Sequence, residues 1–176
     1  MKFMKGIIIS VSIGMVMMTT ISCAQSKKVR VYAYQQSVLP GTRQITIDES
    51  GAAKEAAPKV SNNTLLYVEI PQNKNVDPKH VWINGKLFNV KTSTSTSPVI
   101  IPNTLHPGKP ADTLVHSTTN VVLQLTPSPS AETFNPSSTA KRKMKSNELV
   151  LHTIEDGKDC YYYVEHIKKL DPVALQ

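Results

Sequence analysis

Residues 79–90 read Lys-His-Val-Trp-Ile-Asn-Gly-Lys-Leu-Phe-Asn-Val. The Asn84-Gly85 pair stands between two apolar runs, and a two-residue hairpin turn needs positive φ at both central residues, which Asn and Gly adopt readily. The stretch therefore predicts a β-hairpin with this pair at its tip. The predicted pairs are Ile83 with Lys86, Trp82 with Leu87 and Val81 with Phe88.

A second hairpin is predicted over residues 147–166, where Asp156-Gly157 supplies the turn between two apolar runs. Both faces of this hairpin carry apolar side chains, so we expect it in the interior of its sheet. The predicted pairs are Leu149 with Val164 and Leu151 with Tyr162 on one face, and Val150 with Tyr163 and His152 with Tyr161 on the other.

The rest of the chain alternates between short β-rich runs and polar connections. Two polar connections stand out: the Ser/Thr tract 91–97, expected to be a linker or an edge, and 126–146, rich in Pro, Ser and Thr and expected to be a long irregular loop. A loop is expected over residues 49–63, with a short helix through 52–57 as the alternative. Further strands are predicted at 29–34, 44–48, 64–70, 98–102, 113–116 and 120–125.

Seven to nine short strands, two glycine hairpins and no convincing helix predict an all-β fold in one domain, residues 29–176. An antiparallel, immunoglobulin-like β-sandwich is the first expectation, and a small β-barrel is the alternative. The cysteine and tryptophan pattern of true immunoglobulin domains is missing from the sequence, so this expectation rests on strand count.

The first 23 residues have the pattern of a secretory signal peptide. Lys2 and Lys5 precede an apolar run from Gly6 to Met18, and small or polar residues follow. The run is shorter than the roughly 20 residues that a membrane-spanning helix needs. We therefore expect the leader to direct export and to be removed.

Two cleavage sites are compatible with the end of this leader. Thr20-Ile21-Ser22-Cys23 resembles a bacterial lipobox, and this resemblance implies cleavage before Cys23 and attachment of lipid to that residue. Ser22-Cys23-Ala24 instead fits ordinary signal peptidase, which would leave Gln25 as the N-terminus of a soluble periplasmic or secreted protein.

Residues 24–28 are then a short tether without an acidic residue. Many surface lipoproteins of the Bacteroidota carry acidic residues after the lipidated cysteine, so by this resemblance the domain faces the periplasm from the outer membrane.

The net charge of +7 comes from two basic clusters. An exported protein is not expected to bind nucleic acid, so anionic lipid headgroups or acidic glycans are the expected partners of these clusters. The clusters are Lys27, Lys28 and Arg30, and Lys141, Arg142, Lys143 and Lys145.

No motif in the sequence predicts a catalytic centre, a metal site or a cofactor. Either cleavage leaves Cys160 as the only usable thiol of the domain, so no intramolecular disulfide is expected, and neither His152 nor His166 is fixed beside it. Glu148 and Glu165 face each other in the predicted register, as a paired-carboxylate glycosidase would require, although a hairpin end encloses a substrate poorly.

Three residues are candidates for binding or modification. Alternation along the strand places Tyr161 and Tyr163 on one face, where they could stack against a sugar or a peptide. Asp112-Thr113-Leu114 resembles the O-glycosylation pattern of exported Bacteroidota proteins, which implies a glycan on Thr113.

The sequence thus predicts an envelope protein that binds another envelope component, protein or glycan, without catalysing a reaction. A periplasmic hydrolase with an unfamiliar site and a secreted adhesion-like or assembly module are the alternatives. A deep pocket with converging His, Asp or Glu would favour the hydrolase. An open face bearing Tyr161 or Tyr163 would favour binding, and an uncovered edge strand would favour assembly by strand addition.

Overall fold

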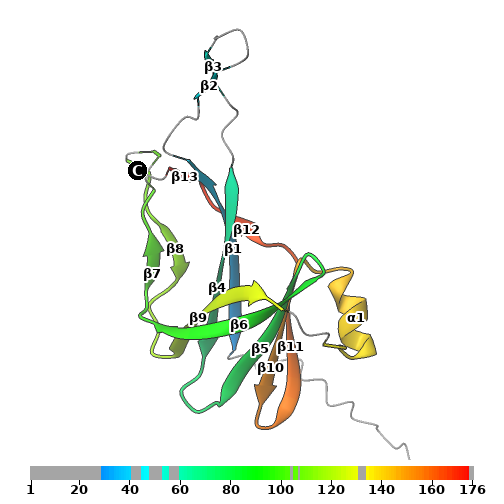
Figure 1. Ribbon diagram of the computed structural model, residues 1–176. Coiled ribbons are helices and arrows are strands. Elements are labelled where there is room, and N and C mark those ends of the chain that lie inside the picture. Colours follow the sequence, from blue (N-terminus) through cyan, green and yellow to red (C-terminus); the bar gives the residue numbers. More distant parts are fainter. Residues whose placement is uncertain are drawn as a thin grey trace, which may run out of the picture.

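The computed structural model describes residues 29–40, 45–47, 53–55, 60–103, 105–106, 108–130 and 134–174. The predicted leader and tether, with Cys23, lie outside these residues. Most of the described chain is in strands, with one short helix (Figure 1). The elements are β1 (Arg30–Leu39), β2 (Ile45–Ile47), β3 (Ala53–Glu55), β4 (Ser61–Ile70), β5 (Val76–Ile83), β6 (Lys86–Ser95), β7 (Val99–Ile101), β8 (Asp112–Val115), β9 (Val121–Pro129), α1 (Ser138–Met144), β10 (Leu149–Glu155), β11 (Lys158–Val164), β12 (Lys168–Lys169) and β13 (Val173–Ala174).

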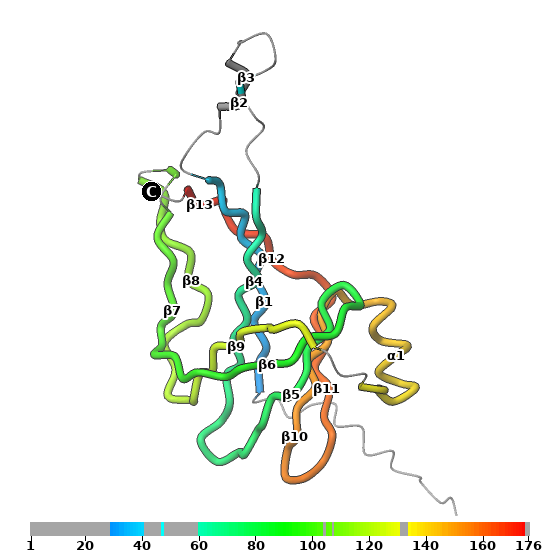
Figure 2. The backbone as a smooth tube through the Cα atoms, in the orientation of Figure 1, coloured from blue at the N-terminus to red at the C-terminus, as the bar shows by residue number. Residues whose placement is uncertain are grey.

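Nine strands form one sheet in the order β11-β10-β5-β6-β9-β4-β1-β12, with β13 also paired to β1. The sheet curls into a half-barrel, and β11 comes close to β1 without any strand pairing between them in the described chain (Figure 1). The tube in Figure 2 shows the C-terminal segment running along β1, to which β12 and β13 pair in parallel. Two small sheets, β2-β3 and β7-β8, complete the described fold.

The prediction of an all-β fold is confirmed, and so are both hairpins in their predicted registers. The turn residues Asn84, Gly85, Asp156 and Gly157 all have positive φ, as a two-residue turn of this kind requires. The finer prediction of an antiparallel sandwich is not confirmed: β12 and β13 pair with β1 in parallel, so the large sheet is mixed, and it curls into a half-barrel.

The concave side of the half-barrel holds the larger core. Alternation along β4 and β10 points Leu66, Val68, Leu149 and Leu151 inward, each at most 1% exposed. Tyr162 packs against the same cluster from β11. Curling brings these side chains from sequence-distant strands into one interior and removes them from water.

A second, smaller core lies on the opposite face of β1, β4 and β9. Tyr34, Tyr67 and Val122 pack there against Leu114 and Val115 of β8, which is why the β7-β8 sheet covers this face. The Tyr34 hydroxyl also donates a hydrogen bond of 2.6 Å to the carbonyl oxygen of Leu114. Here the small β7-β8 sheet packs on the large sheet, which resembles the predicted packing of two layers.

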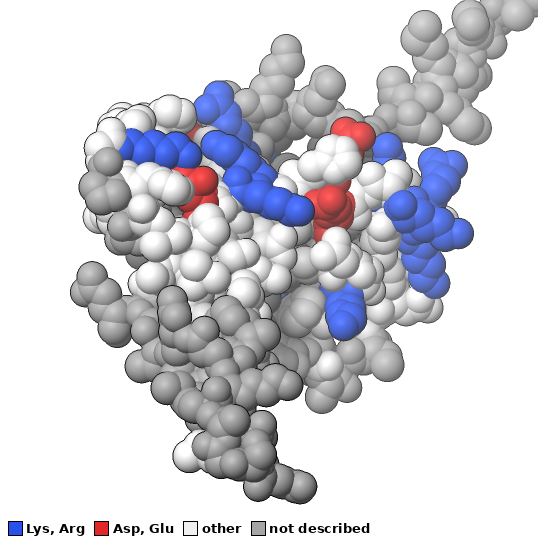
Figure 3. Space-filling model, turned by 90° about the horizontal axis from the view of Figure 1, so that it is seen from above, with Lys and Arg blue, Asp and Glu red and all other residues white. Residues whose placement is uncertain are grey.

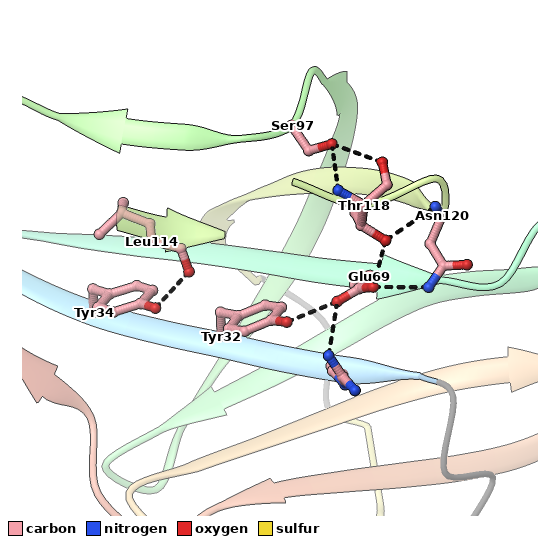
Figure 4. A network of polar contacts seen from close by, with 8 residues as sticks. Tyr32, Tyr34, Glu69, Ser97, Leu114, Thr118 and Asn120 are labelled. Carbon is pink, nitrogen blue, oxygen red and sulfur yellow. Dashed lines mark hydrogen bonds and ion pairs between the residues drawn. The ribbon is translucent and has the colours of Figure 1, made fainter. Parts of the chain in front are cut away.

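Glu69, at 4% exposure, fixes the connection after β8 to the large sheet (Figure 4). Its carboxylate accepts hydrogen bonds from the Tyr32 hydroxyl at 2.7 Å, the Thr118 hydroxyl at 2.8 Å and the Asn120 amide at 2.7 Å. Burial alone would raise the pKa of Glu69, but these three bonds and the Arg30 guanidinium at 3.8 Å hold it below its usual value. The carboxylate is therefore a charged, fully hydrogen-bonded anchor.

Three of the connections predicted to be irregular are ordered. The 91–97 tract continues β6 to Ser95, because it pairs with β9. Residues 53–55 form a strand with 45–47 in place of the expected loop or short helix. Within the expected loop 126–146, the chain first completes β9 to Pro129 and then forms α1, which Ser137 caps by accepting a bond from the Ala140 N–H.

The expectation that the second hairpin lies inside its sheet is wrong for one of its strands, since β11 is the end strand. Its second apolar face is covered instead by the 134–144 segment, from which Ala140 is fully buried and Phe134 stacks on His152 at 4.9 Å. A seven-residue helix with a single buried residue gives almost no amphipathic signal in sequence, so this cover could not be predicted from periodicity.

Candidate functional site

The large sheet splits between β4 and β9. These strands pair only where Leu66–Ile70 lie opposite 121–125, whereas residues 126–129 of β9 pair with β6 alone. The first half of β4, residues 61–65, pairs with β1 on one side. On its other side this half-strand has no strand partner in the described chain.

Pro127 and Pro129 give a physical reason for the split. Proline has no backbone N–H, and it is tolerated in a ladder when its nitrogen points away from the partner strand. Both prolines lie in register with β6, opposite Val90 and Phe88. Their nitrogens therefore face the side of β4, and β9 cannot donate hydrogen bonds to β4 at these two positions.

A cavity of about 570 Å³ lies in this split, and we name it the split-sheet cavity. Its volume is in the range of ordinary ligand pockets. The polar part of its wall is formed by Asn62, Asn63, Thr64, Asn84, Gln124 and Thr126, and the apolar part by Leu65, Ile83, Phe88, Leu125 and Pro127.

The split-sheet cavity offers neutral hydrogen-bonding groups over an apolar floor. Four of its wall residues are amides and two are hydroxyls, and Lys86 is the only charged side chain among the described residues that line it. No His, Asp, Glu or Cys is among those residues. Such a wall can orient an uncharged polar ligand through hydrogen bonds.

A shallower depression of about 350 Å³ adjoins it, since Asn84 lines both. Here the predicted pair of carboxylates does meet, with His166 beside both: Nδ1 is 3.5 Å from Glu148 and Nε2 is 3.9 Å from Glu165. The backbone N–H of Ile167 donates to Glu148 at 2.7 Å and, more than His166, lowers the pKa of that carboxyl. A glycosidase acid needs a raised pKa, so Glu148 is not suited to that role.

A ring cluster lies on the convex face of β5 and β10. His152, 2% exposed, contacts Asp159 through Nε2 at 2.8 Å and His80 through Nδ1 at 3.2 Å. Phe134 stacks on both imidazoles, at 4.6 and 4.9 Å between ring centroids. The two imidazoles are therefore packed beneath an aromatic ring and form part of the attachment of the 134–144 segment, whereas the Asp159 side chain is 67% exposed.

Cys160 does not join these histidines. It is buried on β11 opposite Thr153, and neighbouring residues of a strand point to opposite faces. The thiol therefore shares the inward face with Tyr162, whereas Tyr161 and the imidazole of His152 share the outward face. The structure thus separates the thiol from His152, the partner that a cysteine nucleophile would need.

Tyr161 and Tyr163 do share the outward face, as predicted, but that face is partly covered. Tyr161 stacks on His152 with 5.0 Å between ring centroids. Tyr163 is 38% exposed, and the ammonium of Lys143 lies 5.9 Å from its ring centroid. Of the predicted platform, only Tyr163 presents much surface to solvent, and it does so beneath a cation of α1.

The other predicted positions lie apart from the split-sheet cavity. Thr113 is half-buried in β8 opposite Ile100, and the basic residues of α1, Lys141, Arg142 and Lys143, are exposed. Figure 3 shows a group of blue side chains at the right, the side on which α1 lies in Figure 1. Cys23, the predicted lipid attachment site, lies outside the described residues.

The described residues contain no group of three or more His, Cys, Asp or Glu side chains that could hold a metal ion. Within the same part of the chain, no helix is long and apolar enough to cross a membrane. Comparison of the chain with protein-family models, with curated proteins and with solved structures finds no match.

Sequence reasoning missed the split-sheet cavity. Its walls come from residues 62–65, 83–88 and 124–127, which no local pattern connects. One signal was present, namely the two prolines that directly follow the β9 run. Read as the start of a loop, they instead mark the point where β9 stops pairing with β4 while it continues to pair with β6.

Proposed function

We propose that this protein is an exported, non-enzymatic binding module of a bacterial cell envelope, and that the split-sheet cavity is its ligand site. The observation that carries the proposal is the character of the cavity wall: neutral amides and hydroxyls above Phe88 and Leu125, with Lys86 as the single charge among the described residues that line it. Ligand sites commonly combine an apolar lining with a few well-placed polar groups. The ligand is a protein segment or a glycan of the envelope.

The alternative of a hydrolase has less support. The two acids that meet, Glu148 and Glu165, lie at the surface, with side chains 44% and 77% exposed, and the pKa of Glu148 is lowered. The buried imidazole of His152 is covered by Phe134. Neither group faces the split-sheet cavity, so binding and acid–base chemistry would have to occur in different places.

The proposed address rests on the leader. A lipid on Cys23 would tether the domain through residues 24–28 to the periplasmic side of the outer membrane, and the cationic surface of α1 suits the anionic headgroups near such an anchor. Mass spectrometry of the protein isolated from its host's membranes is expected to give a diacylated or triacylated Cys23. Cys23→Ser is the control and should lose that mass; an unlipidated N-terminus at Gln25 would contradict the anchor.

The ligand site is tested by filling it. Thr126 is exposed on the cavity wall, so Thr126→Trp is expected to fold normally and to occupy the space with an indole. Affinity for a bound probe should fall at least tenfold, measured by titration with hits from a neutral oligosaccharide array and a random peptide library.

Val121→Trp is the matched control, since Val121 is 41% exposed on the same strand and outside the cavity. It should leave the affinity unchanged. The proposed site is wrong if neither class of probe yields a ligand, or if the ligand binds both variants equally.

A further inference from the structure

The geometry points to the class of ligand: we propose that the split-sheet cavity binds an extended polypeptide segment, which adds as a strand to residues 61–65 of β4. This inference rests on the proposed function and narrows it to protein segments. It follows from the backbone of β4, from the opposite edge of the cavity, and from the distribution of charge and apolar surface around it.

The backbone of β4 supplies the template. Within the described chain, residues 61–65 pair with β1 on one side only, so every second residue directs its N–H and C=O toward the cavity. These groups repeat about every 6.7 Å along an edge roughly 17 Å long, at about 3.3 to 3.4 Å per residue. Another extended backbone matches that repeat, whereas the hydroxyls of a sugar do not.

The opposite edge selects which strand the ligand pairs with. At Pro127 and Pro129, β9 has no N–H to donate to an added strand. Prolines on a strand edge block the addition of a further strand there. The β4 edge carries no proline, since residues 61–65 are Ser, Asn, Asn, Thr and Leu. The ligand therefore pairs with β4, and β9 serves as the wall that its side chains meet.

The wall also defines the ligand's side chains. One face of the added strand meets Leu125, 2% exposed, and the partly buried ring of Phe88, which suits β-branched or small apolar residues. The other face meets the amides of Asn63 and Gln124, whereas Asn62 lies on the face of Leu125 because side chains alternate along β4. Lys86 is the only charged side chain among the described residues that line the cavity. The bound segment therefore carries one carboxylate beside Lys86, either its C-terminus or an acidic side chain, and is otherwise uncharged.

The occupant is a segment rather than a second copy of this chain. An open β4 edge could in principle pair with itself across a dimer. The cavity, however, is bounded by the β5-β6 turn and β9 as well as by β4, and about 570 Å³ admits a single strand with its side chains. A second folded domain would have to bring its own β9 and turn into the same space.

The test uses ten-residue random peptides displayed on phage, selected on the purified protein and counter-selected on Thr126→Trp. Enriched peptides are synthesised, and each backbone nitrogen is methylated in turn. Strand addition predicts an alternating result: methylation at every second residue lowers affinity at least tenfold, and at the intervening residues less than twofold. Binding should also slow hydrogen exchange at alternate amides of residues 61–65 at least tenfold, in the parent protein and in Val121→Trp.

Each other outcome overturns the inference. Equal tolerance of methylation at all positions would show that the peptide does not pair through its backbone. If neutral oligosaccharides bind and lose affinity in Thr126→Trp while no peptide is enriched, the cavity is a glycan site, and the proposed function stands without this inference. If the protein dimerises without peptide, and the protection of the β4 amides from hydrogen exchange rises with protein concentration, the edge binds a second copy of the chain instead.

Discussion

Replacing Glu69 with alanine is expected to lower the free energy of unfolding by about 3 kcal/mol. The substitution leaves the hydroxyls of Tyr32 and Thr118 and the amide of Asn120 without their acceptor, at a position only 4% exposed. An unsatisfied buried polar group costs about 1–3 kcal/mol. Because water can reach the three donors in part, we expect their combined cost to be about 3 kcal/mol rather than three times the cost of one group. Urea denaturation at pH 7 measures the change.

Two control variants separate the effect of breaking the hydrogen-bond network from the effect of removing a negative charge. Glu165→Ala removes a carboxylate whose side chain is 77% exposed, and it should change stability by less than about 0.5 kcal/mol. Tyr32→Phe removes one of the three donors and should cost about 1 kcal/mol. If Glu69→Ala is as mild as Glu165→Ala, the carboxylate does not anchor the connection after β8.

The same network has a defined response to acid. The folded-state pKa of Glu69 lies below its unfolded value of about 4.3, so the stability that ionisation contributes is fully present above that value. It is lost as the pH falls through the folded-state pKa. The stability difference between the parent protein and Glu69→Gln should therefore be constant from pH 7 to about 5 and shrink below about 4. A difference that grows in acid would contradict the assigned direction.

Leu151→Ala is expected to destabilise the protein by about 3 kcal/mol, within the range measured for Leu-to-Ala changes in packed cores. Leu151 is fully buried in the centre of β10, where it pairs with Val81 on one side and Tyr162 on the other. Its removal leaves a cavity in the interior of the half-barrel, which the strands on either side cannot collapse to fill.

Thermal unfolding should show this as a fall in Tm of roughly 10 °C for a domain of this size. Ile100→Ala is the control, because Ile100 is 51% exposed on the small β7-β8 sheet, and its Tm should change by only a few degrees. A loss from Leu151→Ala no larger than that of Ile100→Ala would mean that the concave side is not the main core.

Local sequence predicted those parts of the fold in which the interacting residues are close along the chain. The Asn84-Gly85 and Asp156-Gly157 turns fix both loop length and twist, and the register of each hairpin follows from the turn. Alternation then placed Tyr162 opposite to Tyr161 and Tyr163 correctly. The same reasoning failed at 91–97 and in the 126–146 region, where pairing with a distant strand or packing on a distant face overrides weak local propensity.

The candidate site could not be predicted in the same way. Its walls come from three separated parts of the chain, and the edge of β4 is left open because β9 stops pairing with β4 after Leu125 while it continues to pair with β6. The depression at Glu148 and Glu165 was accessible to sequence reasoning, since one hairpin brings these residues together. The hydrogen bond that the Ile167 N–H donates to the Glu148 carboxylate could not be predicted in this way, because it depends on the tertiary structure.

The sequence by itself determined that this protein is built of strands, where its two tight hairpins turn and which residues pair across them, because turn chemistry and alternation act over a few residues. Only the tertiary structure decided that the sheet is mixed, that it curls around Leu66 and Leu151, and that it splits beside β4. Those features depend on which distant strands pair, and the summed burial of many side chains decides that pairing. The two prolines of β9 limit its hydrogen bonding only when β9 lies between β4 and β6.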